Sequence, residues 1–198
     1  MKTIIMETLV LAALAAGQAH AAPISLDNAS ITATYNGRAD GMLGLDHGFQ
    51  AGAGSNTSGL DPSDSGVEFI TADALFAFDF SRTGLLTIYA NIAPPPDGNY
   101  TLTFDFGASL AAPIASFTLV DGSAVGGMPG LSVLGSHAIG LDLSRLAWNG
   151  DFMPITARIA TADAADVPEP ASAALLLAGV AALAAGRRQR RSQPTLRT

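Results

Sequence analysis

The chain of 198 residues contains no cysteine. Disulfide bonds, thiolate metal ligands and a cysteine nucleophile are therefore excluded. If the protein is exported, its hydrophobic core must stabilise the fold without cross-links. The length allows one globular domain, and about 145 residues are enough to form such a core.

Basic residues are also scarce. Lys2 is the only lysine, and five of the nine arginines lie in the C-terminal tail. Residues 22–166 contain fifteen acidic residues and only four arginines. Binding to nucleic acid needs clustered Lys or Arg side chains on the phosphates, so nucleic acid is excluded as a partner. An acidic surface keeps an exported protein soluble or attracts divalent cations.

The N-terminus has the pattern of a secretory signal peptide. Lys2 provides a positive start, residues 9–16 form a short apolar run, and Ala19 and Ala21 provide the small side chains that signal peptidase reads. The alternative, a buried first helix of the domain, fits poorly with the small residues followed by Pro23. We expect a signal peptide over residues 1–21 and a mature protein that begins near Ala22.

Residues 22–166 show the pattern of an all-β domain. Residues 100–106 alternate between apolar and polar side chains, as a half-buried strand does. Turns rich in Gly, Pro and Asp separate the strands, and no amphipathic helical segment interrupts them. The expected fold is an antiparallel β-sandwich or jelly-roll-like domain. The expected strands cover residues 32–35, 67–71, 75–80, 85–91, 100–106, 115–120, 131–134, 138–143 and 155–159.

Residues 36–65 differ from the rest of the domain. Gly, Asn, Ser and Asp dominate this stretch, and few apolar residues anchor it. Long loops within compact domains are often functional or disordered. We expect a long, partly ordered loop in which mobility is favoured.

Catalytic motifs are missing from the sequence. It contains no Gly-x-Ser-x-Gly elbow, no phosphate-binding loop with lysine and no His-Glu-x-x-His motif. Ser136, His137 and Asp142 are the residue types of a hydrolase triad, but adjacent residues of a strand point to opposite faces. We expect a protein that is not an enzyme and that needs no cofactor.

One acidic turn has the composition of a calcium site. Asp61, Ser63 and Asp64 place side-chain oxygens within four residues, and Glu68 follows. Calcium prefers several such oxygen ligands. The same residues are common in ordinary turns, so calcium is one of two interpretations.

Trp148 and Phe152 flank a turn that contains an amide and a carboxylate, Asn149 and Asp151. Exposed aromatic rings can stack on the apolar faces of sugars, because such rings combine an apolar surface with a polar edge. Trp148 and Phe152 are therefore candidate ligand-binding residues. The alternative is that a tryptophan at a strand end covers the core.

The C-terminal tail has three parts. Val167, Pro168, Glu169 and Pro170 form a rigid extended segment, since proline fixes the backbone. Residues 171–186 are small and apolar and would form a helix of roughly 24 Å, short for a hydrocarbon core of about 30 Å. The basic residues that follow should stay on the cytoplasmic side of the membrane: Arg187, Arg188, Arg190 and Arg191.

These three parts resemble the PEP-CTERM sorting signal of Gram-negative bacteria, with Pro168-Glu169-Pro170 as the tripeptide. The resemblance covers residues 167–198. It implies a transmembrane helix that holds the protein in the inner membrane for a time, and an exosortase that removes the tail. It also implies a producer that makes exopolysaccharide and forms biofilms.

Two functional hypotheses follow. The first is an exported, non-enzymatic protein of the cell surface or extracellular matrix, processed by signal peptidase and exosortase. The second is a carbohydrate-binding β-sandwich module, possible partners being exopolysaccharide and calcium. The sequence does not decide between them.

Overall fold

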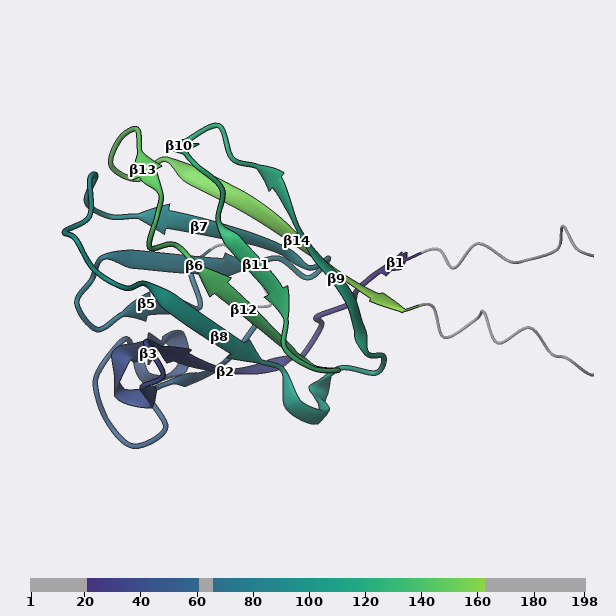
Figure 1. Cartoon of the computed structure of the whole chain (residues 1–198). Helices are drawn as coiled ribbons and strands as arrows, with labels where there is room; N and C mark the ends of the chain where they lie inside the picture. Colours follow the sequence, from purple (N-terminus) through teal and green to yellow (C-terminus); the bar gives the residue numbers. More distant parts are fainter. Residues whose placement is uncertain (1–20, 61–65, 163–198) are drawn as a thin grey trace, which may run out of the picture. The chain divides into compact units, whose positions relative to one another are not determined.

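The computed structural model describes residues 21–60 and 66–162, which lie within one compact unit, His20–Asp163. Their strands form two large antiparallel sheets and one small one (Figure 1). The prediction of an antiparallel all-β domain is confirmed. The expected signal helix and transmembrane helix, at residues 1–21 and 171–186, lie almost wholly outside the described residues.

The first sheet has seven strands in the order β1-β14-β7-β6-β5-β3, and β9 pairs with β14 outside this path. The second sheet has five strands in the order β11-β12-β8-β2-β4, and β10 and β13 form a separate pair. The strands of the first sheet are β1 (Ala21–Pro23), β3 (Met42–Gly44), β5 (Phe69–Thr71), β6 (Phe76–Phe80), β7 (Leu85–Ala90), β9 (Ile114–Asp121) and β14 (Pro154–Ala162). The remaining strands are β2 (Ser30–Tyr35), β4 (Thr57–Gly59), β8 (Thr101–Asp105), β10 (Val125–Gly126), β11 (Gly130–Val133), β12 (Ala138–Asp142) and β13 (Ala147–Trp148).

Side-chain alternation in the five-stranded sheet separates the core from solvent. In β8, Leu102 and Phe104 are buried, whereas Thr101 is exposed. On the outer face Thr34 of β2 lies opposite Thr103 of β8, which lies opposite Gly140 of β12. At these positions the outer face carries two half-buried threonines and a buried glycine, while the inner face packs against the other sheet.

Phenylalanine rings join the two sheets. The ring of Phe104 lies 5.2 Å from that of Phe78, 5.0 Å from that of Phe80 and 6.0 Å from that of Phe69. Phe106 extends the cluster, with its ring 5.9 Å from that of Phe80. Such aromatic pairs contribute about 0.5–1.5 kcal/mol each beyond the burial of their area. This cluster provides the cohesion that a chain without disulfides needs.

The expectation of a long loop over residues 36–65 is wrong for much of that stretch. It contains β3, β4 and two short 3₁₀ helices, η2 (Ala39–Gly41) and η3 (Leu45–His47). Gly44 of β3 donates its N–H to the carbonyl of Ser55 at 2.6 Å, and a Cβ at Gly44 would lie 3.0 Å from the carbonyl oxygen of Thr57. A side chain at position 44 would crowd the backbone carbonyls of Ser55 and Thr57. Three-residue strands that contain glycine are too short to show an alternating pattern.

Strand β14 is the longest strand of the described domain and connects three others. It pairs with β7 along one edge and with β9 along the other. Its last residues pair with β1, so that Ala162 lies opposite Ala21. The two ends of the described domain therefore meet in one ladder, at the right of Figure 1.

The central position of Phe104 generates a stability prediction for the mature chain. Phe104→Ala should lower the free energy of unfolding by about 3–5 kcal/mol, because it leaves a cavity among three rings. Phe152→Ala is the matched control, since this side chain is 64% exposed and its loss should cost roughly 0.5 kcal/mol. Urea unfolding followed by tryptophan fluorescence measures both. Equal losses of unfolding free energy in the two variants would contradict the placement of Phe104 in the core.

Candidate functional site

The predicted processing signals lie at the two ends of the chain. Ala21 is the first residue of β1, and β14 ends at Ala162. Ala19 and the sorting-signal residues lie outside the described residues; the latter are Val167, Pro168, Glu169, Pro170, Arg187, Arg188, Arg190 and Arg191. Over residues 21–60 and 66–162, no helix is long and apolar enough to cross a membrane.

The two aromatic candidates lie in different environments. Trp148 is only 6% exposed and packs 6.1 Å from Phe76, and its indole N–H has no hydrogen-bond partner. Phe152, by contrast, presents most of its ring to solvent and has a left-handed backbone, with φ of 58°. Only Phe152 offers a ring face for stacking; Trp148 covers the core, as the alternative interpretation had it.

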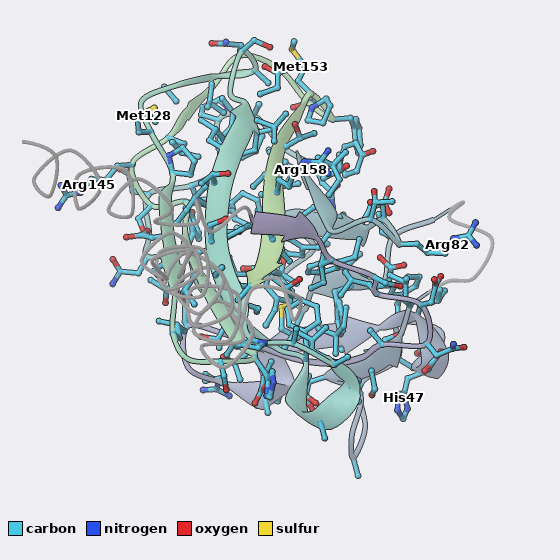
Figure 2. All side chains as sticks on the ribbon, turned by 90° about the vertical axis from the view of Figure 1, so that its right-hand side faces the viewer. His47, Arg82, Met128, Arg145, Met153 and Arg158 are labelled. Atoms are coloured by element: carbon cyan, nitrogen blue, oxygen red, sulfur yellow. The ribbon has the colours of Figure 1, made fainter. Side chains whose placement is uncertain are left out.

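Hydrogen bonds attach the turn that contains Phe152 to the end of β7. The N–H of Phe152 donates to the carbonyl of Ala90 at 2.7 Å, and the carboxylate of Asp151 accepts from the N–H of Ala93 at 2.7 Å. Ile92, between these two attachment points, is exposed, as is Met153. Figure 2 shows Met153 and Met128 at the same end of the domain. An apolar surface formed by Ile92, Phe152 and Met153 therefore lies at this end, and we call it the Phe152 surface.

The candidate calcium ligands are only partly described. Asp61, Ser63 and Asp64 lie outside the described residues. Glu68 is fully buried, and its carboxylate accepts a hydrogen bond from the N–H of Phe80 at 2.7 Å. In the described part of the chain, no three His, Asp or Glu side chains are placed to hold a metal ion. Calcium binding stays a prediction.

The structure does not bring Glu68 and the Phe152 surface together. Glu68 bonds to Phe80 at one end of β6, whereas Phe152 bonds to Ala90, which pairs with Phe76 at the other end. Four residues of a strand span about 13 Å. A sugar bound to Phe152 would therefore lie at a distance from a cation bound near Glu68.

The three residue types of a hydrolase triad are also separated. His137 precedes β12 and Asp142 is the last residue of that strand, so about five strand residues, or roughly 16 Å, separate them. The carboxylate of Asp142 accepts hydrogen bonds from the hydroxyl of Ser144 at 2.6 Å and from its N–H at 2.9 Å. These two bonds hold the pKa of Asp142 below its usual value. The hydroxyl of Ser144 also accepts from the N–H of Tyr100, so Asp142 belongs to a structural turn.

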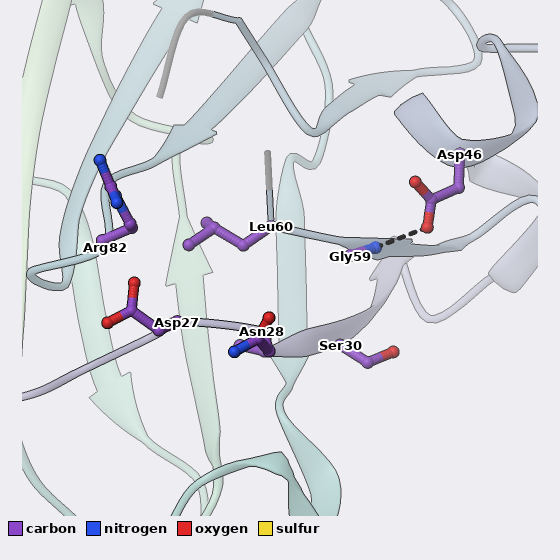
Figure 3. Close-up of a pocket in the computed structure, with 8 residues that line it drawn as sticks. Asp27, Asn28, Ser30, Asp46, Gly59, Leu60 and Arg82 are labelled. Carbon is purple, nitrogen blue, oxygen red and sulfur yellow. Dashed lines mark hydrogen bonds between the residues drawn. The ribbon is translucent and has the colours of Figure 1, made fainter. Parts of the chain in front are cut away.

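A pocket of about 790 Å³ opens at the junction of three segments (Figure 3). Its lining residues come from the turn before β2, from the end of β4 with η3, and from the turn after β6. Arg82 and Asp27 lie on one side of Leu60, and Asp46 lies on the other, where its carboxylate accepts the N–H of Gly59 at 2.8 Å. Sequence reasoning missed this pocket, because its residues are distant in the chain and match no motif. It offers donors and acceptors of hydrogen bonds around one apolar side chain.

The fold and the chain ends together define a class: a β-rich domain followed by a sorting tail. The family model of the PEP-CTERM protein-sorting motif matches residues 166–191. The chain is thus a PEP-CTERM domain-containing protein, and the resemblance of its tail to this signal is confirmed. The motif indicates an exported protein that is sorted by an exosortase to the cell envelope or surface. No curated protein and no solved structure matches the chain.

The Asp142 turn generates a prediction about pH. Ser144→Ala removes the hydroxyl that stabilises the carboxylate, so the pKa of Asp142 should rise toward its usual value. Folding lowers the pKa of Asp142. The stabilisation from the Asp142–Ser144 bonds is therefore fully present above the pKa that Asp142 has in the unfolded chain, and it is lost as the pH falls through the pKa that Asp142 has in the folded protein. The difference in stability between wild type and Ser144→Ala should accordingly be larger at pH 7 than at pH 2.

An NMR titration of the Asp142 carboxyl checks this directly. Asp121 is a suitable internal reference, since a separate serine, Ser123, lowers its pKa. The pKa of Asp121 should not change in Ser144→Ala. An unchanged pKa of Asp142 would show that the hydroxyl of Ser144 does not stabilise the ionised form of Asp142.

Proposed function

We propose that this protein is a non-enzymatic component of the cell surface or extracellular matrix, released there when an exosortase removes its tail. The observation that carries the proposal is the position of the sorting motif. It begins at residue 166, directly after the compact unit that ends at Asp163. Removal of the tail would therefore release the β domain whole. Before cleavage, residues 171–186 would anchor it transiently in the inner membrane.

Further features of the domain support a structural role. Two acidic groups make local structural bonds: Asp142, a residue of the triad considered from the sequence, with Ser144, and Asp46, which lines the pocket, with Gly59. The acidic excess of residues 22–166 keeps such a domain soluble outside the cell. A matrix rich in exopolysaccharide is the setting that the sorting signal suggests.

The processing pathway predicts the mass of the mature protein. Material collected outside the producing cells should begin near Ala22 and end close to Pro168, because signal peptidase and exosortase each remove one end. Intact-mass spectrometry measures both ends in one experiment. Deleting the exosortase gene is the control, and it should leave residues 171–198 attached and the protein in the membrane fraction. Secreted protein that retains this segment would contradict the proposal.

A second candidate function is carbohydrate binding, and the exposed ring of Phe152 favours it. Phe152 is held outward on a left-handed backbone by its bond to Ala90, with Ile92 and Met153 beside it. A fixed aromatic ring can stack on the apolar face of a pyranose. The acidic domain would repel acidic glycans, so a neutral polysaccharide is the ligand that its charge favours.

This second function predicts the effect of one substitution on glycan binding. Phe152→Ala should weaken binding of the mature domain to the producer's neutral exopolysaccharide about three- to tenfold, the equivalent of one stacking contact. Met128→Ala is the matched control, because Met128 is 73% exposed at the same end of the domain. Titration calorimetry with and without calcium measures the affinity and tests the calcium prediction. Equal glycan affinities of the two variants would exclude the Phe152 surface as the glycan-binding site.

A further inference from the structure

We propose that the pocket around Leu60 binds a neutral saccharide through its hydroxyl groups. The pocket lies apart from the Phe152 surface, because Arg82 precedes β7, whereas Phe152 bonds to Ala90 at the other end of that strand. The length of β7, roughly 17 Å, separates the two places. The inference rests on the carbohydrate-binding function proposed above and deepens it, since it adds a second site of a different shape.

Backbone hydrogen bonds tie together the segments that form the pocket. Leu26, in the turn before β2, donates its N–H to the carbonyl of Arg82 at 2.9 Å, and Leu60, after β4, donates its N–H to the carbonyl of Ala29 at 2.9 Å. Asn28 has a left-handed backbone with φ of 60°, a conformation that asparagine tolerates well. The pocket is therefore formed before a ligand binds, and little ordering is left to oppose binding.

At one side of the pocket a guanidinium and a carboxylate line the same space. Figure 3 shows Arg82 and Asp27 together on one side of Leu60. Over residues 21–60 and 66–162 the structure contains one ion pair, between Arg38 and Asp40, so Arg82 and Asp27 are not in direct contact. A guanidinium only donates hydrogen bonds and a carboxylate only accepts them. A hydroxyl does both, so one ligand hydroxyl between the two side chains satisfies each of them.

The other side of the pocket also suits hydroxyl groups. Asp46 accepts the N–H of Gly59 through Oδ2, which leaves Oδ1 as an acceptor for a ligand. Ser30 and Asn28 line the same space, and each side chain carries both a donor and an acceptor. Leu60 provides an apolar surface between the two sides. A saccharide has the matching combination, because its hydroxyls surround apolar C–H faces.

Charge and size restrict the ligand further. The pocket has two carboxylates, Asp27 and Asp46, against the single guanidinium of Arg82, so it repels anionic sugars. A purely apolar ligand would cover these charged groups without replacing their hydrogen bonds to water. The volume of about 790 Å³ lies within the range of roughly 300–1,000 Å³ that is typical of small-molecule pockets. A short neutral saccharide, or the end of a neutral chain, is the ligand class that fits.

The experiment is an NMR titration of the purified full chain in detergent micelles. The neutral probes are glucose, galactose and mannose, and glucuronate is the anionic probe with the same ring as glucose. At least one neutral sugar should shift the amide signals of Gly59 and Leu60, and glucuronate should bind about tenfold more weakly than that sugar. Glucuronate that binds as tightly as the best neutral sugar would overturn the assigned ligand class.

Two substitutions test the side chains that flank the pocket. Arg82→Met and Asp27→Asn should each weaken binding of the neutral sugar about tenfold, because each removes hydrogen bonds to a charged group. The matched controls are Arg145→Met and Asp97→Asn, which make the same changes at exposed residues outside the pocket. These controls should leave the affinity unchanged. The indole signal of the buried Trp148 verifies that each variant is folded. Equal affinities in Arg82→Met and Arg145→Met would contradict the proposal.

The same spectra separate the pocket from the Phe152 surface. Sugar-induced shifts confined to the amides of Ile92 and Phe152 would overturn the pocket proposal and leave the carbohydrate-binding function standing. Shifts confined to Gly59, Leu60 and their neighbours in the pocket would support the pocket and count against the Phe152 surface. If no sugar shifts either set of amides, the pocket proposal fails, and the polysaccharide titration of Phe152→Ala decides the proposed function separately.

Discussion

The packing of Phe104 against Phe69, Phe78 and Phe80 is the contact on which the rest of the domain depends. It joins the middle of one sheet to three positions on two strands of the other. Without cysteines, no cross-link can hold the sheets at a fixed spacing. The loops and the outer faces of the described domain are attached to strands that this contact holds together. The buried carboxylate of Glu68 adds a directional bond at the edge of the same cluster, through the N–H of Phe80.

The sequence predicted the strands that alternate or contain several branched and aromatic residues. Residues 100–106 became β8 (Thr101–Asp105), and residues 75–80 became β6 (Phe76–Phe80). The prediction failed for β3 and β4, whose sequences, Met-Leu-Gly and Thr-Ser-Gly, show no alternation of apolar and polar residues and end in glycine. Their pairing depends on partners far along the chain, such as Thr71 opposite Met42. Short strands of this kind follow from tertiary packing, and local patterns do not reveal them.

The candidate sites also divide into those that local sequence predicts and those that only the folded structure reveals. The tail could be recognised from sequence alone, because its three parts are contiguous and act as a peptide signal. The sequence left two interpretations open for Trp148, and the structure shows it buried in β13, which pairs with β10, whereas Phe152 on the other side of the turn is exposed. The pocket near Arg82 brings together three separate segments, and none of its residues belongs to a motif. Sequence reasoning is strong where function resides in a linear segment and weak where the fold assembles it.

The triple pairing of β14 has a mechanical consequence. The strand leads directly to the tail, and β7 and β9 flank it on both edges. A pull on the tail along the strand axis would load these antiparallel bonds together in shear. Peeling them apart one at a time would need a force across the strand. Tension applied through the C-terminal end of the domain would thus enter the strand that pairs with three others.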